Sequence, residues 1–190
     1  MPGTQQRPPC WRRTRCGADC ILTCTNTTHK LADEVQNAIQ IPLLNIIDIT
    51  ANAIKTARMS RPLLVATSYT MQEEFYTGRL RARHDLIPFV PNAADRAGVH
   101  AIIFDELCCG SLCEGSRQKL IEIVKKGRQA GADSVILGCT EIGLLIGPEH
   151  LPVPTFDSTL LHADEAVQFS LGSSASKMPN VMASLSPTMA

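Results

Sequence analysis

An internal duplication constrains the fold of this 190-residue chain more than any other feature. The segment GADCILTCTNT at residues 17–27 aligns without gaps on GADSVILGCTE at residues 131–141. Both copies predict a buried strand that runs into a polar loop. Downstream, Asp48-Ile49-Thr50 echoes Asp157-Ser158-Thr159, each after a Pro-containing strand and before a helix. A common helix-to-strand turn would also give Gly-Ala-Asp, but the second echo in the same order favours two related half-units.

Short apolar runs alternate with segments of helical periodicity along most of the chain. The expected strands are residues 17–24, 42–47, 62–66, 86–90, 134–137 and 153–156. The expected helices are residues 28–39, 48–57, 70–81, 94–107, 116–130, 141–146 and 159–171. This alternation predicts an α/β fold made of two pseudo-symmetric halves, each with a parallel sheet, and an active site between them.

The two halves are not expected to be equal. An amphipathic helix at 118–129 precedes the second copy of the repeat, whereas PPCWRRTRC precedes the first, so we expect the first half to be incomplete. We assign residues 17–58 to the remnant of the first half and 59–158 to the second half. Residues 159–171 are expected to form a helix that returns to the first half. Residues 1–16 are predicted to be an irregular lead and residues 172–190 a loose tail.

Composition excludes several function classes. Eighteen basic residues balance eighteen acidic ones and aromatics make up 4%, so nothing favours nucleic-acid binding. No apolar run is long enough to span a membrane. The first sixteen residues lack the apolar region of a secretory signal. Their four arginines faintly resemble a transit peptide, but the stretch is too Pro-rich for a good amphipathic helix, and we expect a cytoplasmic protein.

Metal binding finds little support in the sequence. Cys20 and Cys24 fall in one predicted strand, where four residues span about 13 Å, so they cannot share an ion. We expect most of the eight cysteines to be small buried hydrophobes. His29 and Asp33 lie one helical turn apart without a third ligand, which favours a capped or surface histidine. His162 is likewise expected on a solvated helix face.

The repeat has a chemical consequence because it sets Thr25 opposite Cys139. Two facing half-units would present these side chains to a central ligand from opposite sides, as stereoinversion at carbon requires. Cys139 stands between a strand and a helix N-terminus, which is expected to lower its pKa and favour the thiolate. The Thr25 hydroxyl hardly ionises, so it could relay a proton, position a water or only form hydrogen bonds. Asn26 and Thr140 are expected to help hold an α-carboxylate.

Five segments in order resemble the aspartate/glutamate racemase family, covering about residues 17–171. They are CTNTTHKLAD, TSYTMQEEFYTGRL, DELCCG, GCTEIGLL and PTFDSTLLHADEAV. The resemblance implies two pseudo-symmetric α/β halves, no cofactor, no metal and a homodimer. It implies a catalytic pair in which Cys139 is the second residue, in Gly-Cys-Thr. Thr25 stands at the first position, where the family usually has the cysteine of Cys-Asn-Thr.

The resemblance also assigns the residues that hold the substrate. The positions expected to bind its carboxylate and amino groups are Asn26, Thr27, Thr67, Thr70 and Thr140. Ala66 stands where the family usually has glycine, so this loop is expected to be tighter. Family members also begin with a strand, a glycine-rich loop and a helix ahead of the position of Gly17, and the chain resembles an N-terminally truncated member.

The function expected from these features is racemisation of a small acidic amino acid, aspartate or glutamate, by cofactor-independent two-base proton transfer. Two alternatives remain open. One is a related one-thiol decarboxylase or cis–trans isomerase, which the lack of a cysteine at residue 25 would fit. The other is an inactive, truncated remnant of the family that binds a ligand without turning it over.

Overall fold

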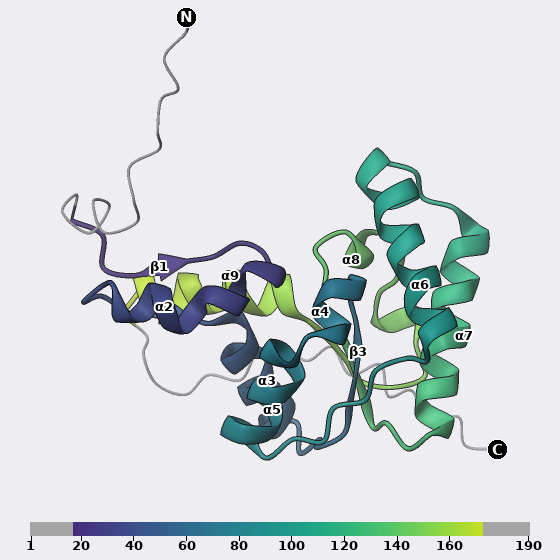
Figure 1. Cartoon of the computed structure of the whole chain (residues 1–190), viewed down its shortest axis with the longest axis horizontal. Helices are drawn as coiled ribbons and strands as arrows, with labels where there is room; N and C mark the ends of the chain where they lie inside the picture. The colour runs from purple at the N-terminus through teal and green to yellow at the C-terminus, as the bar shows by residue number, and fades with distance from the viewer. Residues whose placement is uncertain (1–16, 173–190) are drawn as a thin grey trace, which may run out of the picture.

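Two parallel sheets form the frame of the molecule in the computed structural model, which describes residues 17–172 (Figure 1). In the first sheet, β1 (Ile21–Leu22) pairs with β2 (Leu43–Leu44). In the second, β4 (Ser134–Leu137) lies between β3 (Pro62–Val65) and β5 (Thr155–Asp157). The predicted α/β fold with parallel sheets is therefore confirmed. The expectations for residues 1–16 and for the tail beyond residue 172 lie outside the described residues.

Helices connect the strands and cover the sheets. In chain order they are η1 (Thr27–Leu31), α2 (Ala32–Asn37), α3 (Ile46–Thr56), α4 (Ser68–Gln72), α5 (Glu74–His84), α6 (Ala93–Ala101), η2 (Ile102–Glu106), η3 (Leu107–Cys109), α7 (Glu114–Gln129), α8 (Ile142–Leu145), η4 (Pro148–His150) and α9 (Ser158–Ser170). Helix α9 packs against α3 and β2, while α7 packs against β3. Figure 1 shows α2 and α9 beside β1, with α6 and α7 at the opposite end of the molecule.

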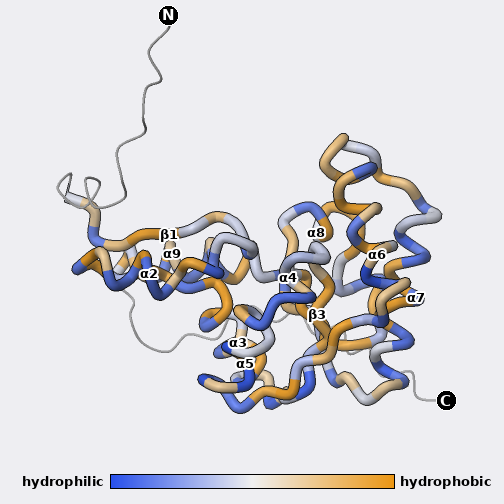
Figure 2. The backbone as a smooth tube through the Cα atoms, viewed as in Figure 1, coloured by the Kyte–Doolittle hydropathy of each residue, from blue (hydrophilic) through white to orange (hydrophobic). Residues whose placement is uncertain are grey.

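The core is centred on β3 and β4, in which every residue is buried. Their apolar side chains, such as Leu64 and Ile136, are inaccessible on both faces of the sheet because helices cover both. Burial of each such side chain contributes about 1.5–3 kcal/mol. Helix α7 presents Leu120 and Val124 to this core, and Figure 2 shows hydrophobic and hydrophilic turns alternating along it.

The two copies of the repeat begin with the same backbone turn. Gly17 and Gly131 have φ values of 77° and 101°, in the left-handed region that glycine adopts without strain. The predicted correspondence between Asp48 and Asp157 is not found in the structure. Asn45 caps α3 and Asp157 caps α9, each accepting two backbone N–H groups. The structural counterpart of Asp157 is therefore Asn45, and Asp48 lies almost one helical turn further on.

Several predicted elements are altered in the structure: the strands expected at 17–24 and 42–47 shorten to β1 and β2, and the helix expected at 28–39 begins as the 3-10 helix η1. The strand expected at 86–90 is reduced to one bridge between Leu63 and Phe89, because the prolines at 88 and 91 have no N–H to donate. The helix expected at 70–81 divides into α4 and α5 at Glu73, whose backbone is extended. The helix expected at 94–107 changes at Ile102 into η2, a π-helical turn.

The expectations for cysteine and histidine burial were largely wrong. Four described cysteines are exposed, because they lie in loops and short turns rather than in strands: Cys24, Cys108, Cys109 and Cys113. Conversely, His29 and His162 are each only 4% exposed, and their rings meet edge to face with centroids 5.9 Å apart. Within residues 17–172, no helix combines the length and the apolar character that crossing a membrane requires.

Candidate active site

A cavity of about 280 Å³ opens where the chain leaves β1, β3 and β4. Strand ends are the usual ligand position in parallel sheets, because polar loops converge there. Twelve residues line it: Cys24, Thr25, Asn26, Thr27, Thr67, Ile103, Phe104, Cys108, Gly138, Cys139, Thr140 and Glu141. The structure thus brings Thr25 and Cys139, from the two copies of the repeat, to one cavity. Four of the five residues predicted to bind substrate line it as well.

Thr70, the fifth, stands behind the cavity. It is fully buried in α4, and its hydroxyl lies 3.1 Å from that of Thr27 and 3.2 Å from that of Thr67. Thr67 caps the same helix by accepting the Thr70 N–H. Thr70 therefore connects the two lining threonines to each other.

Asn26 connects the first loop to the second sheet through a chain of hydrogen bonds. Its side-chain amide donates to Ser158 Oγ at 3.1 Å, and that hydroxyl donates in turn to the carbonyl of Leu137, the last residue of β4. The loop after β1 is thereby tied to the second sheet. The other amide atom, Asn26 Oδ1, is buried and has no hydrogen-bond partner among residues 17–172. An unsatisfied buried acceptor at a cavity wall suits an N–H donor on a ligand.

Cys139 is half-buried and donates its S–H to Glu141 Oε2 at 2.9 Å. Burial and then this hydrogen bond raise the pKa of the Cys139 thiol to about 12, against a smaller lowering by the backbone N–H of Glu141. The prediction of a lowered pKa was therefore wrong. The following helix, α8, has only four residues, so its dipole is too weak to offset burial next to a carboxylate.

No role was predicted from the sequence for several of the lining residues. Glu141 could have been found, because it directly follows the Gly-Cys-Thr motif. Ile103 and Phe104 form an apolar side of the cavity, but they reach it from the π-helical turn η2, for which the sequence carries no signal. Gly138 is required by close packing, because a Cβ there would lie 2.9 Å from Leu64 Cδ1. Within residues 17–172, no group of three His, Cys, Asp or Glu side chains could hold a metal ion.

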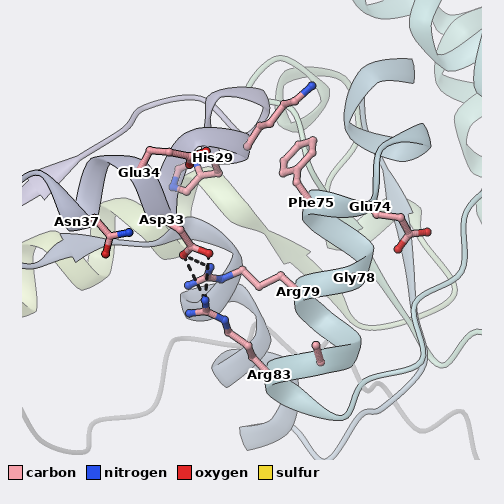
Figure 3. Close-up of a pocket in the computed structure, with 11 residues that line it drawn as sticks. His29, Asp33, Glu34, Asn37, Glu74, Phe75, Gly78, Arg79 and Arg83 are labelled. Carbon is pink, nitrogen blue, oxygen red and sulfur yellow. Dashed lines mark hydrogen bonds and ion pairs between the residues drawn. The ribbon is translucent and has the colours of Figure 1, made fainter.

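A larger cavity, of about 540 Å³, lies between η1, α2 and α5 (Figure 3). Figure 3 shows Asp33 pointing toward Arg79 and Arg83, which it contacts at 3.0 and 3.2 Å. Arg79 also donates two hydrogen bonds to Asp48. Burial raises the pKa of Asp48, but hydrogen bonds from Arg79 and His84 outweigh it, so the pKa of Asp48 is lowered. These charges satisfy one another and connect helices. The smaller cavity, which holds the thiol and the free amide oxygen, is therefore the candidate active site.

Comparisons with known proteins bear on the family and the fold of the chain. The sequence profile of the family described as Asp/Glu/Hydantoin racemase matches residues 11–166. A solved candidate Asp/Glu racemase from Yersinia pestis is 40% identical with a TM-score of 0.81, over 85% of this chain and 70% of that one. A solved aspartate racemase homologue from Pyrococcus horikoshii OT3 is 32% identical with a TM-score of 0.77, over 84% of this chain and 70% of that one.

Curated relatives are more distant. The glutamate racemase of Staphylococcus epidermidis is 27% identical over 139 residues, which is 67% of this chain and 47% of that protein. The chain thus spans about half the length of this relative. The profile match over most of the chain shows that the chain belongs to the Asp/Glu/Hydantoin racemase family.

Proposed function

We propose that this chain inverts the Cα of a small acidic amino acid, aspartate or glutamate, by two-base proton transfer without a cofactor. The observation that carries the proposal is that Thr25 and Cys139 line one cavity although they follow strands of two different sheets. Inversion needs one group that removes the proton from one face of Cα and another that delivers a proton to the opposite face. Side chains that arrive from separate strand ends suit those two tasks.

The polar lining suits the α-amino and α-carboxylate groups of such a substrate. Asn26 Oδ1 is an acceptor without a partner in the described part of the chain, which fits the substrate ammonium. The hydroxyls of Thr27 and Thr67, joined through Thr70, can donate to the carboxylate. Their buried, hydrogen-bonded setting fixes these donors in place before the substrate arrives, so binding requires little reorganisation.

Glu141 gives Cys139 a way to act at neutral pH despite its high pKa. When Cys139 is the base, Sγ takes the proton from Cα while its own S–H proton passes to the Glu141 carboxylate 2.9 Å away. When Cys139 is the acid, Glu141 must first be protonated; Sγ then gives its proton to the substrate carbanion and receives one from the Glu141 carboxyl group. The substrate carbanion and the carboxylate exchange one proton in either case, and no free thiolate accumulates.

Thr25 is the weaker member of the pair. Its side chain is exposed, and among the described residues its hydroxyl makes no hydrogen bond. A hydroxyl is a poor base, so Thr25 serves as a proton donor or positions a water on its face of Cα. The two directions of inversion should therefore differ in kcat, with KM differing in the same proportion because the two enantiomers have equal free energy.

The test is exchange of the Cα proton of L- and D-aspartate and L- and D-glutamate in deuterated water, followed by proton NMR. Cys139→Ala should abolish exchange with all four compounds. Cys113→Ala is the matched control, because this thiol is exposed and lies outside the cavity. Exchange that persists in Cys139→Ala would remove the thiol from the mechanism.

One observation favours a second candidate, a one-thiol decarboxylase. Ile103 and Phe104 give the cavity an apolar side, and no lysine, arginine or histidine is among its described lining residues. Such a wall suits a neutral substituent of a malonate better than a second carboxylate. Loss of CO₂ would leave a carbanion that Cys139 protonates. Release of CO₂ from phenylmalonate, without Cα exchange of aspartate or glutamate, would establish this function instead.

A further inference from the structure

His29 lies behind the loop that carries Thr25 and Asn26, and both of its ring nitrogens bind the backbone. Nδ1 lies 2.9 Å from the carbonyl oxygen of Thr25, while the backbone N–H of Ile46 donates to Nε2 at 3.1 Å. The N–H of Ile46 can only donate, so Nε2 must be an acceptor. The carbonyl of Thr25 can only accept, so Nδ1 must carry the proton. The contacts therefore fix one neutral tautomer of the ring.

These two bonds connect the cavity loop to the start of a core helix. Ile46 is the first residue of α3 and is only 2% exposed. Thr25 lies in the loop after the short strand β1. Among the described residues, its carbonyl accepts from His29 and otherwise only from the exposed hydroxyl of Thr28, at 3.2 Å. A two-residue strand offers little support to the loop that follows it. The imidazole ring thus supplies the buried anchor of this loop at residue 25.

We propose that His29 is a positioning residue for the proposed racemase site, and that it holds Thr25 in place only while its ring is neutral. The effect on catalysis rests on the proposed function, whereas the anchoring of the Thr25 loop by His29 is independent of it. Protonation would place a hydrogen on Nε2, opposite the N–H of Ile46, and the acceptor would be lost. Two facing donors repel each other, so α3 and the Thr25 loop would separate at this point.

The surroundings of His29 favour the neutral ring. Desolvation by burial lowers its pKa first of all, opposed by the bond to the Thr25 carbonyl. From the packed elements, His162 of α9 and Arg79 of α5 disfavour a positive charge, while Asp48 of α3 favours one. Asp33, on the helix after η1, is engaged by Arg79 and Arg83. The anchor is therefore intact at neutral pH and fails on acidification.

The first experiment tests, without any substrate, whether His29 holds the Thr25 loop against Ile46. Amide hydrogen exchange of Ile46 and of the loop at 25–27 is measured by NMR between pH 5 and 8, corrected for intrinsic exchange. In the native chain, protection at Ile46 should fall at least tenfold as His29 becomes protonated. In His29→Gln, whose amide oxygen can accept the same N–H but does not titrate, protection should show no such step. An identical step in both proteins would overturn the proposal.

The second experiment reads catalysis through Cα exchange of aspartate. His29→Ala should lower kcat at least tenfold while alkylation of Cys139 stays within twofold, because the thiol lies on the other sheet. His29→Gln should recover much of kcat and lose the acidic limb of the pH profile that His29 imposes. His150→Gln, a histidine of η4 outside the cavity, is the matched control.

The two experiments separate the two proposals. A native chain that shows the Ile46 step but no Cα exchange keeps the anchor and refutes the racemase. A chain that exchanges Cα protons and retains full kcat in His29→Ala refutes the positioning role. If His29→Ala and His29→Gln lose kcat, Cys139 alkylation and thermal stability equally, His29 acts only as a core residue. That result would also refute the positioning role.

Discussion

Replacing Glu141 with glutamine tests the contact on which the proton transfer depends. The carboxylate oxygen lies 2.9 Å from the Cys139 sulfur, so ionising the thiol places two negative charges at that distance. Even at the dielectric constant of water, two unit charges this close repel by about 1.4 kcal/mol, which is roughly tenfold in the thiolate population. Glutamine removes the repulsion but leaves burial, the first cause of the raised pKa, unchanged. The pKa of Cys139 should fall yet stay above its usual value.

The assay is alkylation by iodoacetamide at pH 8, followed by mass spectrometry. Trypsin releases residues 129–177, in which Cys139 is the only cysteine, so its rate is read separately from the exposed thiols. Glu141→Gln should alkylate Cys139 about tenfold faster, in line with the repulsion removed.

In the same variant, Cα exchange should become slower, by about 10²-fold or more, because the carboxylate that accepts the proton of the thiol is gone. Glu149→Gln is the control, since this carboxylate lies on η4 away from the cavity. Slower or unchanged alkylation in Glu141→Gln would refute the thiol–carboxylate contact. Faster alkylation with normal exchange would refute the proton transfer.

The remaining predictions concern rates, stability and packing. Thr25→Cys should speed the slower direction of inversion, measured as initial Cα exchange from each enantiomer, and no change would mean that residue 25 does not face the substrate. Burial lowers the pKa of His29 and of His162, so the unfolded chain binds more protons and the unfolding free energy should fall from pH 7 to 5. Urea titrations check this, and a flat profile would contradict it. Gly138→Ala should destabilise the fold by about 1–3 kcal/mol because of its close approach to β3. Gly115→Ala, which adds a Cβ in open space on helix α7, should be neutral or stabilising in the same thermal melts.

The elements that the sequence predicted well are those that local patterns specify. Continuous apolar runs marked β3 and β4, and helical periodicity marked α7 and α9 close to their observed ends. The prediction failed where backbone hydrogen-bond partners determine whether a strand or an α-helix forms. Residues 86–90 are apolar enough for a strand, but their prolines leave a single bridge to β3. The π-helical turn that brings Phe104 to the cavity depends on packing that no local pattern encodes.

The sequence by itself determined which residues meet. A gapless repeat places equivalent residues at equivalent strand ends, so Thr25 and Cys139 could be paired from letters alone, although their strands belong to two different sheets. Only the tertiary structure decided their chemical state. The direction of the Cys139 pKa depends on burial and on a carboxylate 2.9 Å away, and the tautomer of His29 depends on two backbone groups 4 and 17 residues distant in sequence. Desolvation and hydrogen-bond partners are properties of three-dimensional surroundings, which residue order does not contain.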